Sequence, residues 1–196
     1  MNKLGILIII VSAILIRIFP HMPNFTPIGA LALFGGSYIN KKYSVLVILL
    51  TMFVSDYLLL YFNPFVPGWF HFTKIYSPTV ALHSSTLYIY GSFLIYVLIG
   101  WLISKKRTAV KVGAGALLGA IQFFLITNAA VWINGAYARD ISGLWESYVM
   151  GIPFFQGTLL GDLFYTGVFF GGYELAIKVA RTYNLSLITD KIGHKS

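Results

Sequence analysis

Long apolar runs separated by short polar stretches constrain this chain more than any other feature of its sequence. A helix needs about 20 apolar residues, and fewer at the short end of the range, to cross a bilayer core of about 30 Å. We expect six spans, over residues 4–19, 26–39, 43–62, 84–103, 109–133 and 153–177. The sequence therefore predicts an all-α integral membrane protein: a six-transmembrane-helix bundle forming a single transmembrane domain over residues 1–196.

Composition supports lipid as the surrounding solvent. Hydrophobic residues make up 58% of the chain and charged residues only 10%, whereas soluble domains carry about 25% charged residues. The net charge of +8 is spread between the apolar runs, which is typical of topology signals and does not indicate nucleic-acid binding. The chain has no cysteine, which excludes disulfides, thiol catalysis and thiolate metal sites.

Three polar stretches interrupt or end the apolar pattern. Residues 63–83 hold several prolines and predict an irregular loop that can contain a short interfacial helix. We expect a second polar loop over residues 134–146 and a polar tail over residues 184–196. The first run also has the length of a signal-peptide core, but no small-residue cleavage site follows it, which favours a retained helix.

Lysine and arginine predict the orientation of the chain, because cytoplasmic loops carry an excess of both. With six spans, eleven of these residues fall on one side and three on the other. The larger set is Lys3, Lys41, Lys42, Lys105, Lys106, Arg107, Lys111, Lys178, Arg181, Lys191 and Lys195, and the smaller set is Arg17, Lys74 and Arg139. We expect both termini on the cytoplasmic side of the inner (cytoplasmic) membrane.

Charged residues within the predicted spans are the most informative about function. A charge at the bilayer centre costs roughly 2.5–3.5 kcal/mol on insertion scales, so each one needs a partner or a cavity. Arg17 and Asp56 each lie thirteen residues along their spans, about 20 Å from the cytoplasmic edge. They can form a buried pair that fixes helix register, or face a substrate cavity. Asp162 can likewise contact polar groups of other spans or line a cavity.

Motifs for catalysis and metal binding are missing. The chain has no G-x-x-x-x-G-K-[ST] segment, so it lacks a P-loop for ATP, and it has no H-E-x-x-H segment. Ser92 would need a membrane-embedded base to act as a nucleophile, and the fifth and sixth spans contain no histidine. A metal site remains open only if His21, His71 and His83 meet at the outer face. We therefore expect that the protein is not an enzyme and that it holds no cofactor or resident metal.

Small residues recur at a spacing of four, which lets helix backbones approach closely in membranes. Packing within the bundle and a flat face for a partner membrane protein are both compatible with this pattern. The pairs are Ala32 and Gly36, Gly115 and Gly119, Ala116 and Ala120, and Gly167 and Gly171.

Three segments, together with Ser55 and Asp56, resemble an uncharacterised family of bacterial membrane proteins associated with transport. The segments are 17–36 (RIFPHMPNFTPIGALALFGG), 128–135 (NAAVWING) and 153–162 (PFFQGTLLGD). That family in turn is similar to the S components of energy-coupling factor (ECF) transporters, in size, number of spans and segment layout. The resemblance covers residues 17 to about 174.

The resemblance implies a division of labour. S components are six-helix proteins that capture a vitamin-like small molecule at the outer face, and a separate transmembrane scaffold with two ATPases releases it inside. The missing P-loop agrees with that arrangement. Many S components carry an A-x-x-x-A face on the first helix; here the first helix has one alanine, and the small-residue face lies on the second span, at Ala32 and Gly36.

We therefore predict a substrate-binding subunit whose pocket opens on the non-cytoplasmic side, between residues 17–27 and 132–156. Polar groups in an apolar cleft would hold the substrate, and aromatic rings would stack on it. Arg17 and His21 would hold an anionic group, and Asn128 and Asp162 would converge from neighbouring spans. The substrate-binding candidates are Arg17, His21, Asn24, Asp56, Asn128, Trp132, Phe154, Gln156 and Asp162.

A self-sufficient permease or channel is the alternative from a different class. It would use Asp56 and Asp162 as a relay for protons or cations. Such a carrier should lose transport when either aspartate becomes asparagine, whereas an S component should lose transport when its ATPase partner is removed.

The predicted topology can be tested with reporter fusions. A reporter inserted at Lys105–Arg107 should read cytoplasmic and one at Trp69 should read external, because of the eleven-to-three distribution of basic residues. A reporter at Ser196 that reads external would contradict six spans with both ends inside.

Overall fold

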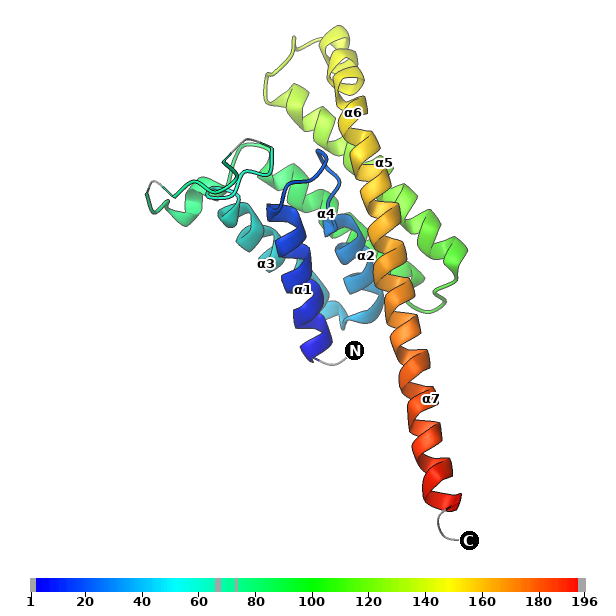
Figure 1. Ribbon diagram of the computed structural model, residues 1–196. Helices are drawn as coiled ribbons and strands as arrows, with labels where there is room; N and C mark the ends of the chain where they lie inside the picture. Colours follow the sequence, from blue (N-terminus) through cyan, green and yellow to red (C-terminus); the bar gives the residue numbers. More distant parts are fainter. Residues whose placement is uncertain (1–2, 66–67, 73, 194–196) are drawn as a thin grey trace.

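The chain folds into helices that run alternately up and down (Figure 1). The computed structural model describes residues 3–65, 68–72 and 74–193, and within these ranges it describes the side chains of residues 4 to 182. These residues form helices and connections and contain no strand, apart from an isolated bridge between Phe62 and Phe70. The helical elements are α1 (Lys3–Ile18), α2 (Ile28–Tyr38), α3 (Lys41–Leu58), η1 (Pro78–Ala81), α4 (Thr86–Ile103), α5 (Ala109–Ile133), α6 (Ile141–Thr166), η2 (Gly167–Gly171) and α7 (Gly172–Gly193).

The connections gather at two ends of the bundle. Residues 19–27, 59–65, 68–72, 74–85 and 134–140 lie at what we call the upper end, and residues 39–40 and 104–108 lie at the lower end (Figure 1). Side-chain caps begin three of the helices: Asn40 accepts a hydrogen bond from the amide of Lys42, Thr108 accepts one from the amide of Lys111, and Asp140 accepts one from the amide of Gly143. The 3₁₀ turn η1 agrees with the short helix expected within residues 63–83.

Helix α2 is the centre of the bundle. Every residue from 28 to 37 is buried, and the helix contacts α1, α3, α4, α5 and α6. Its glycines and alanines keep it thin, so neighbours approach its backbone directly. A Cβ atom on Gly36 would overlap the carbonyl oxygen of Val97 on α4, and one on Gly100 would overlap the carbonyl oxygen of Leu33. The Ala32 and Gly36 pair therefore packs inside the molecule.

The other small-residue pairs divide between two environments. Gly115, Gly119, Ala116 and Ala120 are buried on α5, and a Cβ on Gly119 would overlap the ring of Tyr96. Gly167 and Gly171 instead have no other part of the molecule within 4 Å of a Cβ position. Packing within the bundle therefore explains the small residues of α5, but it does not explain Gly167 and Gly171.

The last long helix departs most from the sequence prediction. Instead of a span that begins at residue 153, α6 begins at Ile141 and continues through η2, a π-helical turn, into α7. The second half of the loop expected over residues 134–146 is therefore helix. Pro153 lies inside α6 on its exposed side, where the lost backbone hydrogen bond faces outward and the helix can bend.

The lower part of this helix leaves the bundle. Figure 1 shows α7 extending below the other helices as a single arm. The expected polar tail over residues 184–196 is helical as far as residue 193, but its side chains, including Lys191 and Lys195, lie outside the described residues.

Two of the described helices, α4 and α5, are long and apolar enough to cross a bilayer, judged by length and composition alone. Helices α1 and α2 are apolar but shorter. The fold is thus all-helical over the described residues, with two candidate spans.

The close crossing of α2 and α4 predicts opposite effects for two alanine substitutions on one helix. Gly100→Ala should lower the stability by about 2 kcal/mol, because the blocking atoms are backbone and overpacking costs roughly 1–3 kcal/mol. Gly91→Ala, where a Cβ meets nothing within 4 Å, should be neutral or gain up to about 1 kcal/mol. Thermal unfolding in mild detergent measures both, and equal stability of the two variants would contradict the crossing.

Candidate functional site

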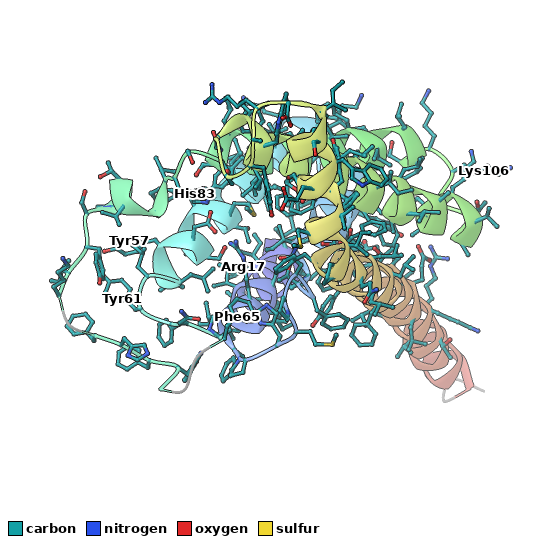
Figure 2. The ribbon with its side chains drawn as sticks, turned by 90° about the horizontal axis from the view of Figure 1, so that it is seen from above. Arg17, Tyr57, Tyr61, Phe65, His83 and Lys106 are labelled. Carbon is teal, nitrogen blue, oxygen red and sulfur yellow. The ribbon has the colours of Figure 1, made fainter. Side chains whose placement is uncertain are left out.

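Arg17, near the end of α1, forms an ion pair with Asp56 on α3. The Arg17 Nη1 atom lies 2.6 Å from Asp56 Oδ1, and the two side chains are 17% and 13% exposed. The same nitrogen donates to the hydroxyl of Ser55. The prediction that Arg17 and Asp56 lie at matching depth and interact directly is confirmed. Figure 2 shows Arg17 near the middle of the bundle, viewed from above, and Lys106 at its margin.

Tyr90 on α4 completes this cluster. Its hydroxyl donates to the second carboxylate oxygen of Asp56, Oδ2, over 2.6 Å. Each oxygen of Asp56 therefore has a partner, and α1, α3 and α4 are joined at one level. Since the arginine and the aspartate neutralise each other, the cluster carries no net charge.

Asp162 on α6 is held differently. It is 3% exposed, and the hydroxyl of Tyr96 on α4 donates to its Oδ2 atom. It lies against Gly29 of α2, where a Cβ atom would overlap the carboxylate. Over the described residues the only ion pair within 4 Å is that of Arg17 and Asp56. Asp162 is therefore hydrogen-bonded but has no basic partner.

Arg17 of the first cluster meets Asp162 and Tyr96 of the second in the wall of one small cavity below the 19–27 connection, which Asp56 and Tyr90 do not line. Its volume is about 150 Å³, and three predicted site residues, Arg17, Asn24 and Asp162, contribute to its wall. The complete lining is Arg17, Asn24, Thr26, Ile28, Gly29, Ile89, Phe93, Tyr96, Phe123, Thr158 and Asp162. Asn24 adopts φ 60°, a left-handed conformation that asparagine tolerates better than most residues. We call this space the Asp162 cavity.

The size of the Asp162 cavity limits its contents. A water molecule occupies about 30 Å³ of liquid, so 150 Å³ corresponds to a few waters or a ligand of few heavy atoms. Pockets for larger ligands have volumes of about 300–1,000 Å³. In this conformation the cavity fits a small polar or charged group rather than a whole vitamin-like molecule.

Asn128 lies in a separate place, so the expectation that it converges with Asp162 is wrong. Its side chain donates to the carbonyl of Phe124 and packs on Gly151. Because α6 begins at Ile141 rather than at residue 153, Asn128 faces a turn eleven residues before Asp162, roughly 16 Å along the helix. Asn128 and Phe154 instead line a second cavity of about 220 Å³.

The three remaining predicted residues lie apart from the Asp162 cavity. The Nδ1 atom of His21 is 2.6 Å from the carbonyl of Phe19, and His21 lines an open groove of about 700 Å³ between α1 and α6. The indole of Trp132 donates to the carbonyl of Ala138 and closes the 134–140 connection. Gln156 is exposed on α6.

Sequence reasoning missed the tyrosines that hold the two aspartates. Tyr90 and Tyr96 lie six residues apart in the fourth apolar run. A buried tyrosine hydroxyl needs a hydrogen-bond partner, so both residues could have been matched to the aspartates of neighbouring spans. Thr158 on α6, four residues before Asp162, was also missed and lines the same cavity.

The metal alternative finds no support in the described part of the chain. No three or more His, Cys, Asp or Glu side chains gather there closely enough to hold a metal ion. His21, His71 and His83 therefore do not form the shared site left open by the sequence. Ser92 is fully buried, and its hydroxyl has no hydrogen-bond partner.

Comparison with known proteins gives one match. The sequence model of a family described as "Family of unknown function (DUF6580)" matches residues 2–185. No curated protein and no solved structure matches the chain.

The ion pair predicts non-additive stability changes. Asp56→Asn should destabilise the protein by about 3 kcal/mol, because it leaves the guanidinium of Arg17 buried without its counter-charge. The double variant Arg17→Gln, Asp56→Asn should be destabilised less than Asp56→Asn alone. Tyr90→Phe, which keeps the pair and removes one hydrogen bond, should cost about 1 kcal/mol. Thermal unfolding of the wild type, Asp56→Asn, Arg17→Gln and the double variant measures the coupling, and strictly additive effects of the two single substitutions would contradict it.

Proposed function

We propose that this chain, which belongs to DUF6580, a family of unknown function, is a multi-pass membrane transport protein. It would bind a small molecule at its upper end. The observation that carries this proposal is the buried carboxylate of Asp162, which lines a cavity and has no basic partner among the described residues. A buried charge of this kind within an apolar segment is costly and marks substrate or ion pathways.

The exterior of the helices supports a lipid environment. Large apolar side chains are exposed on α1, α3, α4, α5 and α6, the helices around α2. A soluble protein rarely exposes so much contiguous apolar surface. The exposed side chains include Leu7, Val11 and Leu15 on α1, Leu46, Leu50 and Val54 on α3, Leu98 and Leu102 on α4, Leu117, Leu118, Ile121 and Leu125 on α5, and Leu160, Leu163 and Phe164 on α6. If α2, which its neighbours enclose, crosses the membrane together with them, the chain crosses the membrane six times.

The distribution of charged and aromatic residues supports the orientation. Lys41, Lys42 and residues 105–107 lie at the lower end, whereas Lys74 and Arg139 lie at the upper end. Basic residues concentrate on the cytoplasmic side of membrane proteins, so the lower end is cytoplasmic and the upper end external. Phe65, Phe70 and Phe72 are exposed in the upper connection, which suits the membrane interface.

The two clusters give the cavity its chemical preference. Arg17 is neutralised by Asp56, so the group left to attract a ligand charge is the carboxylate of Asp162. The sequence had suggested an anionic group held by Arg17. The geometry favours the opposite sign: a small cationic or hydrogen-bond-donating group on Asp162, with Asn24 and Thr158 as polar neighbours.

An S-component-like role is the form of transport we favour. The up-and-down order of the helices and the connections between them support it, as does the missing P-loop, which means that ATP energy would have to come from another protein. In this role the chain captures its substrate at the outer face, and an ECF transmembrane scaffold with ATPase subunits releases it. A vitamin-like substrate would place its charged group in the Asp162 cavity and would require the 19–27 connection to move.

A proton- or cation-coupled permease is the second candidate, and the same carboxylate favours it. A cavity of about 150 Å³ beside Asp162 can hold a partly hydrated cation. Asp56 contributes less to such a relay than the sequence suggested, because Arg17 and Tyr90 already occupy its oxygens. Loss of uptake without the ATPase partner supports the S-component role, and uptake that persists without it supports the permease.

Removal of the Asp162 charge tests the binding role. We expect the purified wild-type protein to retain a small molecule at Asp162, and Asp162→Asn, which keeps the size of the side chain, should abolish this retention. Mass spectrometry of extracts from the purified protein measures this retention. Glu146→Gln, which removes an exposed carboxylate at the upper end of α6, is the matched control and should retain the ligand. A ligand that Asp162→Asn retains at the wild-type level would contradict the proposal.

A further inference from the structure

A further cavity, larger than the Asp162 cavity, lies at the lower end of the bundle, between the first turns of α5 and the junction of α6, η2 and α7. Its volume is about 370 Å³, within the range of ligand pockets. The lining is mostly apolar, with polar groups at few points. We call it the Thr166 cavity, after its deepest polar residue, and it shares no lining residue with the Asp162 cavity.

The hydroxyl of Thr166 is the first sign that this cavity takes a ligand. The residue is 4% exposed, and its Oγ1 atom has no hydrogen-bond partner. Other buried or half-buried helix threonines in the chain donate to the carbonyl four residues earlier: Thr51 to Val47, Thr127 to Phe123 and Thr158 to Phe154. An unsatisfied buried hydroxyl costs about 1–3 kcal/mol, so Thr166, unlike these three, has a hydrogen bond to gain from a ligand.

The wall beside Thr166 is bare backbone. Gly113 on α5 and Gly167 and Gly171 on η2 line the cavity, and a Cβ on any of them would meet nothing within 4 Å. The π-helical turn at residues 167–171 shifts the helix register at this level, and such turns often occur at functional sites. A flat glycine surface accepts an alkyl chain at van der Waals distance.

Charges of both signs lie at the lower mouth of the cavity. The guanidinium of Arg107 lies over the ring of Tyr38, 4.2 Å from its centroid, and donates to the carbonyl of Ser37. The hydroxyl of Tyr38 donates to Glu174 Oε1 over 2.7 Å. Tyr38 thus contacts both Arg107 and Glu174, and the described residues show no ion pair between these two side chains. One oxygen of Glu174 and one terminal nitrogen of Arg107 keep unused hydrogen-bonding capacity.

We infer that the Thr166 cavity binds a zwitterionic aminophospholipid. The phosphate would pair with Arg107 and the primary ammonium with Glu174, an alkyl chain would lie on the glycines, and Thr166 would donate to an ester carbonyl. An anionic headgroup without an amine would meet the Glu174 carboxylate, and a quaternary amine has no N–H for it. This inference rests on the membrane placement proposed above and is independent of the Asp162 cavity.

Lipid titration of the detergent-purified protein, followed by native mass spectrometry, tests the inference. Phosphatidylethanolamine should bind about tenfold more tightly than phosphatidylglycerol or phosphatidylcholine, which corresponds to one favourable charge contact. Free phosphoethanolamine should bind far more weakly than the lipid. Binding of free phosphoethanolamine as tight as that of the lipid would overturn the lipid assignment, and equal binding of the three lipids would overturn the headgroup assignment.

Variants locate the binding. Gly167→Leu should place its side chain in the cavity and weaken phosphatidylethanolamine binding at least about tenfold, whereas Gly91→Leu, at a helix glycine with equally open surroundings, should not. Thr166→Val should weaken binding about fivefold while the lipid-free protein unfolds at the same or a higher temperature, because an unsatisfied hydroxyl is removed. Asp162→Asn should leave phosphatidylethanolamine binding unchanged. The lipid inference can therefore be tested separately from the proposed transport role of Asp162. Lipid binding unaffected by Gly167→Leu would overturn the inference.

Discussion

The packing of α2 against bare backbone is the constraint on which the rest of the structure depends. At Gly36 and Gly100, α2 and α4 approach so closely that a Cβ atom on either glycine would overlap the other helix. At Gly29 the missing side chain leaves the space that the Asp162 carboxylate fills. The thin central helix therefore holds the bundle together, and it also brings α4 and α6 to the distance at which Tyr96 can donate to Asp162.

The same arrangement separates two kinds of buried charge. Arg17 and Asp56 satisfy each other and Tyr90 closes their cluster, so this part of the wall is neutral and stiff. Asp162 receives a hydrogen bond but no compensating charge, and it faces the cavity. The ion pair joins the helices, whereas the carboxylate of Asp162 has no charged partner among the described residues and, in the function proposed above, would hold the ligand.

The sequence predicted much of this arrangement because apolar periodicity and charged residues within apolar runs are local signals. The helices up to residue 133, the small-residue face of α2 and the contact between Arg17 and Asp56 could all be predicted. The course of α6 could not, because Pro153 resembles a helix start while the cap that begins the helix, Asp140, lies in a polar stretch. Because the last span was predicted to begin at residue 153 rather than at Ile141, Asn128 was expected at the level of Asp162. The tyrosine partners depend on which helix faces which, and that information is not local.

The central claim is that Asp162 gives the upper cavity a negative charge that is reached from outside the cell. The chain has no cysteine, so Thr158→Cys introduces a single thiol into the wall of that cavity. The measurement is the labelling rate of this thiol in intact cells by small, membrane-impermeant thiol reagents of opposite charge. The account predicts labelling from outside, faster for the cationic reagent than for the anionic one. Labelling only from the cytoplasmic side, or a faster reaction with the anionic reagent, would contradict it.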